Sequence, residues 1–78
     1  MHDFVIPKVG MGITEVEIVD WKVSSGDTVH EGEPLVEIEG DKAVILLESD
    51  ISGVVRELLF QEEDIVEVGS AVCRIEKE

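Results

Sequence analysis

The feature that most constrains the fold of this chain is an internal repeat. When the sequence is shifted by 37 positions, residues 15–39 fall on residues 52–76, and strand-like and turn-like segments coincide. Several aligned pairs exchange one apolar residue for another, and five pairs are identical. The identical pairs are Asp27/Asp64, Val29/Val66, Gly32/Gly69, Ile38/Ile75 and Glu39/Glu76. The repeat predicts two similar halves related by a pseudo-twofold axis.

Eight short segments have the alternating or β-branched pattern of strands, and turn-forming residues separate them. No segment shows convincing helical periodicity. A change of phase between Ile18 and Val19 predicts a β-bulge or a strong twist. The expected strands are His2–Pro7, Glu15–Val23, Thr28–His30, Pro34–Glu39, Ala43–Leu47, Val54–Phe60, Ile65–Glu67 and Ala71–Glu76. We therefore expect residues 1–78 to form one all-β domain, a flattened eight-stranded barrel or sandwich of two four-stranded antiparallel sheets.

One loop is expected to break this symmetry. The first strand aligns with Val44–Glu48 at a shift of 41, so the loop after it should be about four residues longer than its counterpart. This loop, Lys8–Thr14, contains the segment Gly10-Met11-Gly12. The segment lacks the third glycine, the following helix and the basic residue of a phosphate-binding loop, so we do not assign phosphate binding to it.

The composition narrows the classes of function. A formal net charge of −13 disfavours nucleic acids and anionic membranes as partners and favours proteins with basic patches. No apolar run approaches the roughly 20 residues that span a bilayer, and we expect no signal peptide. The single cysteine, Cys73, fits a reducing compartment. It aligns with Val36 in the repeat, so we expect a buried thiol rather than a nucleophile.

No catalytic triad, acid pair or metal-ligand cluster stands out. His2 and His30 are scattered, and neither has a partner at a metal-binding spacing. Trp21 aligns with Leu58 in the repeat, so we expect it to pack in the core or at its edge. We therefore do not expect catalysis or metal binding by this chain alone.

The stretch Glu39-Gly40-Asp41-Lys42-Ala43 lies near the middle of the chain, between two expected strands. Gly40-Asp41 is typical of a turn, so we expect a β-hairpin with Lys42 at its tip. A lysine on a turn is ordinarily only a solvated charge. Lys42 is, however, one of only four lysines in a strongly acidic chain.

These five residues resemble the lipoylation site of lipoyl domains, commonly Glu-Thr-Asp-Lys-Ala. The resemblance extends over the whole chain and includes Pro7–Gly12, Glu15–Trp21, Gly26–Val29, Gly53–Val55 and Val68-Gly69. It implies the lipoyl domain of a dihydrolipoamide acyltransferase, the E2 component of a 2-oxo acid or acetoin dehydrogenase complex. The family fold is a flattened eight-stranded barrel with pseudo-twofold symmetry.

Several positions depart from the family pattern. Gly40 replaces a usual threonine, Val16 replaces a usual glycine, and Leu46 stands where an acidic residue is common. Met11 occupies a place often held by glutamate, and Glu48 and Asp50 stand where prolines are common. These departures bear on how partner enzymes recognise the domain more than on the expected fold.

The resemblance implies a swinging-arm carrier with lipoic acid attached as an amide to Lys42. The arm would accept an acyl group from a thiamine-dependent decarboxylase (E1), deliver it to coenzyme A at the E2 core, and be reoxidised by dihydrolipoamide dehydrogenase (E3). A lipoate ligase or lipoyl transferase would recognise the hairpin residues Glu39, Gly40, Asp41 and Ala43. In the family this loop lies beside the hairpin, and we hypothesise that the loop residues Gly10, Met11, Gly12, Ile13 and Thr14 contribute to recognition by the decarboxylase. The alternative is that the loop is a tolerated surface insertion.

We further expect a monomeric domain, a piece of a larger E2, in the cytoplasm or in a mitochondrial matrix. Three alternatives remain. A biotin carrier shares the fold, but its lysine is normally flanked by methionines and not by residues such as Asp41 and Ala43. A glycine-cleavage carrier is usually considerably longer. The third alternative is an unmodified interaction module, which intact-mass analysis would distinguish.

Overall fold

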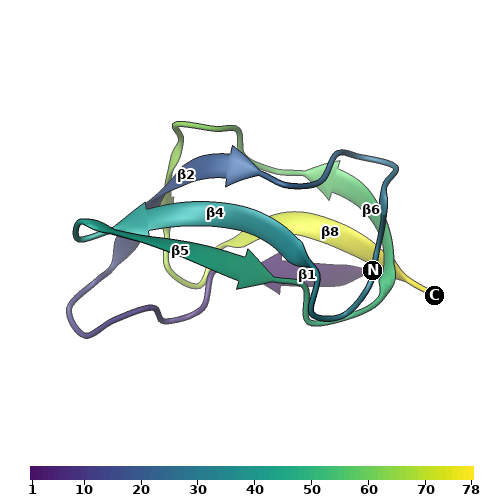
Figure 1. Ribbon diagram of the computed structural model, residues 1–78, viewed down its shortest axis with the longest axis horizontal. Helices are drawn as coiled ribbons and strands as arrows, with labels where there is room; N and C mark the ends of the chain where they lie inside the picture. Colours follow the sequence, from purple (N-terminus) through teal and green to yellow (C-terminus); the bar gives the residue numbers. More distant parts are fainter.

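A computed structural model describes residues 1–78 and contains eight β-strands and no helix (Figure 1). The strands are β1 (His2–Val5), β2 (Glu15–Trp21), β3 (Thr28–Val29), β4 (Pro34–Gly40), β5 (Ala43–Glu48), β6 (Gly53–Leu58), β7 (Ile65–Glu67) and β8 (Ala71–Lys77). All eight expected strands are present, and no boundary differs from expectation by more than two residues. A membrane-spanning helix is therefore absent from this structure.

The strands form two four-stranded antiparallel sheets, with orders β1-β8-β6-β3 and β5-β4-β2-β7. Each sheet takes two strands from each half of the repeat, so neither half is a sheet by itself. The sheets stack into an elongated molecule of 35 × 20 × 18 Å (Figure 1). The predicted all-β sandwich with pseudo-twofold symmetry is confirmed.

The β-bulge predicted after Ile18 is present, and the repeat duplicates it. The register of β2 against β4 shifts between Ile18 and Asp20. The register of β6 against β8 shifts between Val55 and Glu57, at the equivalent positions. A bulge increases the local twist of a strand, so both sheets bend at corresponding places.

The identical residues of the repeat have the same structural roles in both halves. The Asp27 and Asp64 carboxylates each accept a hydrogen bond from the backbone N–H three residues earlier, at 2.8 Å. Gly32 and Gly69 have φ angles of 91° and 93°, in the left-handed region that favours glycine. The repeat therefore preserves turn chemistry as well as the apolar pattern.

The alignment of the first strand is corrected by the observed pairing. His2 pairs with Ile75 in one sheet, and Ile45 pairs with Ile38 in the other. Since Ile38 and Ile75 are repeat partners, His2 corresponds to Ile45, at a shift of 43 and not 41. The expected shift was wrong because an alternating strand slipped by two residues keeps the same side chains inward. The β1–β2 loop is therefore six residues longer than its counterpart, not four.

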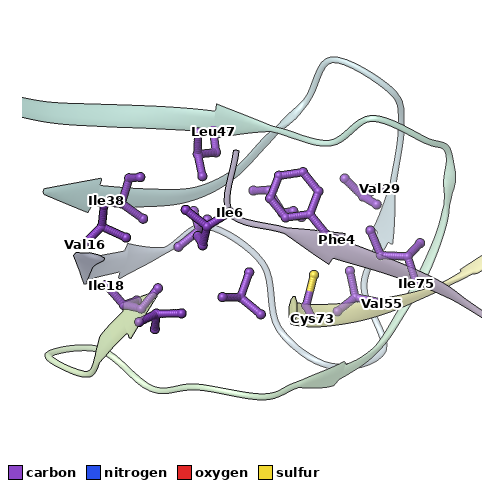
Figure 2. Close-up of a cluster of buried hydrophobic side chains, with 14 residues drawn as sticks. Phe4, Ile6, Val16, Ile18, Val29, Ile38, Leu47, Val55, Cys73 and Ile75 are labelled. Carbon is purple, nitrogen blue, oxygen red and sulfur yellow. The ribbon is translucent and has the colours of Figure 1, made fainter. Parts of the chain in front are cut away.

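A core of 14 buried hydrophobic residues fills the space between the sheets (Figure 2). Cys73 lies in this core with no exposed surface, as predicted. Desolvation raises the pKa of its thiol to about 12, so the thiol stays protonated and unreactive at neutral pH. Trp21 is half-buried against the core, and its indole Nε1 donates a hydrogen bond to the Phe60 carbonyl at 3.0 Å.

Candidate functional site

The turn between β4 and β5 has Asp41 and Lys42 at its two central positions. Gly40 and Ala43 form the last pair of the β4–β5 ladder. The φ angles of Asp41 and Lys42 are 49° and 67°. Positive φ at both central positions is characteristic of a type I′ turn, whose twist matches that of the flanking strands. The predicted hairpin is confirmed, but the turn begins one residue later than expected, because Gly40 belongs to β4.

The backbone at Lys42 is unusual for a lysine. Residues other than glycine seldom adopt positive φ, and those that do are most often Asn, Asp or His. Asp41 suits this region, whereas Lys42 occupies it only because the ladder on either side closes the turn. Such conformations cluster at functional sites, where the surrounding structure holds them.

The Lys42 side chain is exposed, and its amine makes no ion pair. Lys22 provides the contrast, because its amine lies 2.7 Å from Asp20 and 2.8 Å from Glu37. The hydrogen bonds to these two carboxylates raise the pKa of Lys22, which holds that amine in its charged form. The Lys42 amine is free of such partners, at a hairpin tip that projects from the end of the molecule opposite both chain termini (Figure 1).

The β1–β2 loop, residues 6–14, lies beside this hairpin (Figure 1). Ile13 N–H donates a hydrogen bond to the Gly10 carbonyl at 3.3 Å, and Gly12 has a φ of 80°. A turn with positive φ at its third residue is of type II, and here it leaves the Met11 side chain 97% exposed. A shallow hollow of about 360 Å³ lies between this turn and Asp41. The structure thus brings the expected loop residues and the hairpin to one end of the molecule.

Gly40 is buried, and a side chain at this strand position would crowd Val16. A Cβ at Gly40 would lie 3.2 Å from Val16 Cγ1 and 3.4 Å from Ile13 Cγ2. Val16 and Gly40 are two of the departures from the lipoyl pattern, and they meet at the base of the hairpin. The sequence analysis gave Val16 no part in the site. The signal that could have identified it was the pair of departures, a larger residue at position 16 and a smaller one at position 40.

An exposed apolar ridge follows Lys42 on β5, an edge strand. Val44 and Leu46 are 57% and 46% exposed, on the face opposite the buried Leu47. Their cross-strand neighbours on β4 are the acidic residues Glu39 and Glu37. This ridge was not predicted, although the alternation of side chains along β5 places Val44 and Leu46 on the same face.

No group of three or more His, Cys, Asp or Glu side chains is arranged to hold a metal ion. His2 and His30 each contact a single carboxylate, at 3.0 Å, belonging to Asp50 and Glu33 respectively. The backbone N–H of His30 also donates to Glu33, and this hydrogen bond, the larger cause, lowers the pKa of Glu33. Both histidine pairs are surface contacts.

Comparison with known proteins gives a consistent set of similarities. The biotin–lipoyl family model, described as "Biotin-requiring enzyme", matches residues 2–75. The chain is 39% identical over 74 residues to the dihydrolipoyllysine-residue acetyltransferase component of the pyruvate dehydrogenase complex from Staphylococcus aureus strain N315. The corresponding component from Staphylococcus epidermidis strain ATCC 12228 has the same identity. These alignments cover 95% of this chain but only 17% of either relative.

The solution structure of the lipoyl domain of the 2-oxoglutarate dehydrogenase complex from Azotobacter vinelandii is also similar. It superposes with a TM-score of 0.80 at 26% sequence identity. The match covers 99% of this chain and 98% of that domain. The whole fold described above is therefore that of a lipoyl domain.

Proposed function

Because the chain belongs to the biotin–lipoyl family, we propose that it is a swinging-arm carrier that bears lipoic acid on Lys42 in a 2-oxo acid dehydrogenase complex. The observation that carries the proposal is the position of Lys42. Its unpaired amine stands at the tip of a type I′ turn, at the end of a molecule 35 Å long. A partner enzyme can approach this tip without meeting the bulk of the sandwich.

The residues at the tip fit an amide-linked cofactor. The Lys42 amine is exposed and can form an amide with a carboxylic acid such as lipoic acid. No cavity is needed, because the group is held by one covalent bond. The neighbours Asp41 and Ala43 favour lipoic acid over biotin, whose lysine is normally flanked by methionines.

When bound, lipoic acid supplies a strained ring disulfide, which can take up an acyl group together with two electrons. The chain contributes presentation and protection. The β4–β5 ladder holds the tip in place, and the sandwich keeps the one protein thiol away from the arm. Cys73 is fully buried, and its pKa of about 12 keeps it from exchanging with a disulfide.

The partners we propose are the enzymes of such a complex and the enzyme that attaches the cofactor. A lipoate ligase or lipoyl transferase would act on the hairpin at residues 39–43. A thiamine-dependent decarboxylase, an acyltransferase core and dihydrolipoamide dehydrogenase would then meet the arm in turn. Residues 10–14 lie at the same end as Lys42 and supply the decarboxylase with a contact surface around Met11.

The experiment that tests this proposal has two steps. The purified chain is treated with lipoate ligase, ATP and lipoic acid, and in parallel with biotin protein ligase and biotin. The lipoylated product is then offered to decarboxylases specific for pyruvate, 2-oxoglutarate, branched-chain 2-oxo acids or acetoin. Lipoylation of Lys42, followed by acylation with one substrate class, supports the proposal. Modification by biotin alone would indicate a biotin carrier, and no modification of the folded chain would indicate an interaction module.

A further inference from the structure

Ile13 of the β1–β2 loop packs in a narrow space between two glycines. A Cβ at Gly40 would lie 3.4 Å from Ile13 Cγ2 and 3.7 Å from Ile13 Cδ1. A Cβ at Gly10 would lie only 2.9 Å from Ile13 Cδ1. The 2.9 Å approach requires the Ile13 methyl to move, whereas a single Cβ at Gly40 would only touch Ile13 at ordinary contact distance. A longer, branched side chain at position 40 would extend into the space that Ile13 occupies. We call this space, bounded by Gly10, Gly40 and Val16, the Ile13 seat.

The backbone of β4 gives no other reason for glycine at position 40. Gly40 lacks the positive φ of the turn glycines and pairs regularly with Ala43. Glycine weakens the interior of a strand and often marks a place where another group approaches closely. Here the approaching groups are the side chains of Ile13 and Val16.

The seat links the loop to the arm-bearing turn. Gly40 is two residues from Lys42, and Ile13 closes the turn that exposes Met11. The two ends of the loop are fixed elsewhere. Ile6 N–H donates to the Ser70 carbonyl at 3.0 Å, and the Thr14 carbonyl accepts from Val68 N–H at 2.9 Å. Between these anchors, the Ile13 side chain reaches the hairpin at Gly40.

We propose that Gly40 is a positioning residue. Because Gly40 places no branched side chain in this space, Ile13 can pack at the base of the hairpin, and the packed Ile13 holds the Gly10–Ile13 turn, with Met11 exposed on it, at a fixed place beside Lys42. The functional consequence rests on the proposed function, in which a decarboxylase recognises the loop and the arm together. A surface held in place before binding loses less conformational freedom on association, so the seat favours productive docking.

The test adds a side chain to the Ile13 seat from the hairpin and from the loop, and in a third variant it removes the Ile13 side chain. Gly40→Val fills it from the hairpin, Gly10→Ala fills it from the loop, and Ile13→Ala removes its occupant. Each glycine substitution is also combined with Ile13→Ala. Lys77→Val is the matched control, because position 77 is the repeat counterpart of position 40 and is exposed at the end of β8. Thermal melting verifies that every variant is folded.

The first readout is structural and needs no cofactor. In the unmodified wild-type chain, the Ile13 Cδ1 methyl should give a nuclear Overhauser effect to the Gly40 α-protons. This contact should be lost in Gly40→Val, where one α-proton remains as a reporter, and in Gly10→Ala. It should persist in Lys77→Val. A nuclear Overhauser effect of wild-type strength in both glycine variants would show that the glycines do not position Ile13. This result would overturn the proposal whether or not the chain is lipoylated.

The second readout is kcat/KM for reductive acylation of each variant, after intact mass has verified complete lipoylation. Gly40→Val and Gly10→Ala should each lower kcat/KM by about tenfold, and Lys77→Val should not. In the Ile13→Ala background, either glycine substitution should add less than about twofold, because the loop then has no isoleucine side chain to be displaced. A valine at position 40 still crowds Val16 Cγ1 in that background, but this contact falls on β2 and not on the loop. Fully additive losses would show that Gly40 acts without Ile13 and would overturn the proposal. If no decarboxylase acylates the wild type, the proposed function fails. The nuclear Overhauser effect still tests whether Ile13 packs against Gly40.

Discussion

The two ends of the sandwich are built from equivalent strands, yet they are closed differently. At one end, β4 passes into β5 through the Asp41–Lys42 turn, and residues 6–14 form a nine-residue loop beside it. At the opposite end, the chain termini take the place of the turn (Figure 1), and the stretch that the repeat aligns with residues 6–14 has only the three residues 49–51, within the four-residue β5–β6 loop 49–52. There Glu78 N–H donates to the Ser52 carbonyl at 3.3 Å, and His2 contacts Asp50 at 3.0 Å.

The comparison separates the features that the fold requires, which occur in both halves, from the features that occur at one end only. Bulges, capping aspartates and buried strand residues recur in both halves, so they belong to the scaffold. The free lysine, the positive φ angles at positions 41 and 42, and the long loop occur once, and all at one end. The asymmetric features are therefore the candidates for function.

The largest expected effect comes from removing the amine at the hairpin end. In Lys42→Arg, lipoate ligase should attach no lipoyl group, because the other three lysines lack the flanking Asp41 and Ala43. Intact mass before and after the reaction measures this, with the wild type as the positive control. Modification of the folded variant at the wild-type rate would place the site elsewhere and make the two ends equivalent.

Exchanging Asp41 and Lys42 tests whether the position of the amine matters as well as its presence. A one-residue displacement along a hairpin redirects the side chain, so modification should be lost. The fold should survive, since both residues already occupy positive φ. Circular dichroism and intact mass check the two halves of this prediction. Rapid lipoylation of a well-folded exchange variant would contradict it.

Deleting residues 8–13 makes the two loops equal in length. The anchors at Ile6 and Thr14 remain, so the chain should still fold and be lipoylated. Its stability should fall somewhat, because the deletion removes Val9 and Ile13, which pack against the core. Reductive acylation by the cognate decarboxylase should fall by about tenfold or more, equivalent to about 1.4 kcal/mol of transition-state binding. The measurement is kcat/KM on fully lipoylated protein. Acylation at the wild-type rate would reduce the loop to a connector.

The smallest effect is expected in the shared core. Cys73→Ala removes one buried sulfur and should lower the free energy of unfolding by about 1 kcal/mol at neutral pH, without changing acyl transfer. The wild-type thiol has a pKa raised from 9.0 to about 12 in the folded state. Since the unfolded chain then loses its proton first, stability should decline from about pH 9 towards pH 12, and Cys73→Ala should remove that part of the decline.

Chemical denaturation of both proteins between neutral and alkaline pH measures this difference. Identical pH profiles would show that the thiol ionises equally in the folded and unfolded states. A folded, lipoylated Cys73→Ala domain that could not be acylated would show that the thiol takes part in the reaction.

Local patterns predicted most of the fold. Strand alternation, turn residues and the phase change at Ile18 each depend on neighbours in the sequence, and the structure confirms all three. The alignment of β1 was wrong because a slip of two residues preserves which side chains face inward. Only the observed pairing of His2 with Ile75 distinguishes the two alignments.

The candidate site was less predictable, because its packing joins residues distant in sequence. Lys42 at the hairpin tip followed from the local turn signal and from a family resemblance. The role of Gly40 was not predictable from the sequence, because a glycine beside an aspartate is also typical of a turn. Its contacts with Ile13 and Val16 depend on how β2 and the loop lie against β4, which no local pattern specifies.

The most direct test of a cofactor-bearing hairpin is the mass of the chain isolated from its native host, followed by peptide mapping. We expect one lipoyl group on the peptide that contains Lys42, and none on peptides containing Lys8, Lys22 or Lys77. A biotinyl group at Lys42, a lipoyl group on another lysine, or an unmodified Lys42 in cells whose other lipoyl proteins are loaded would contradict it.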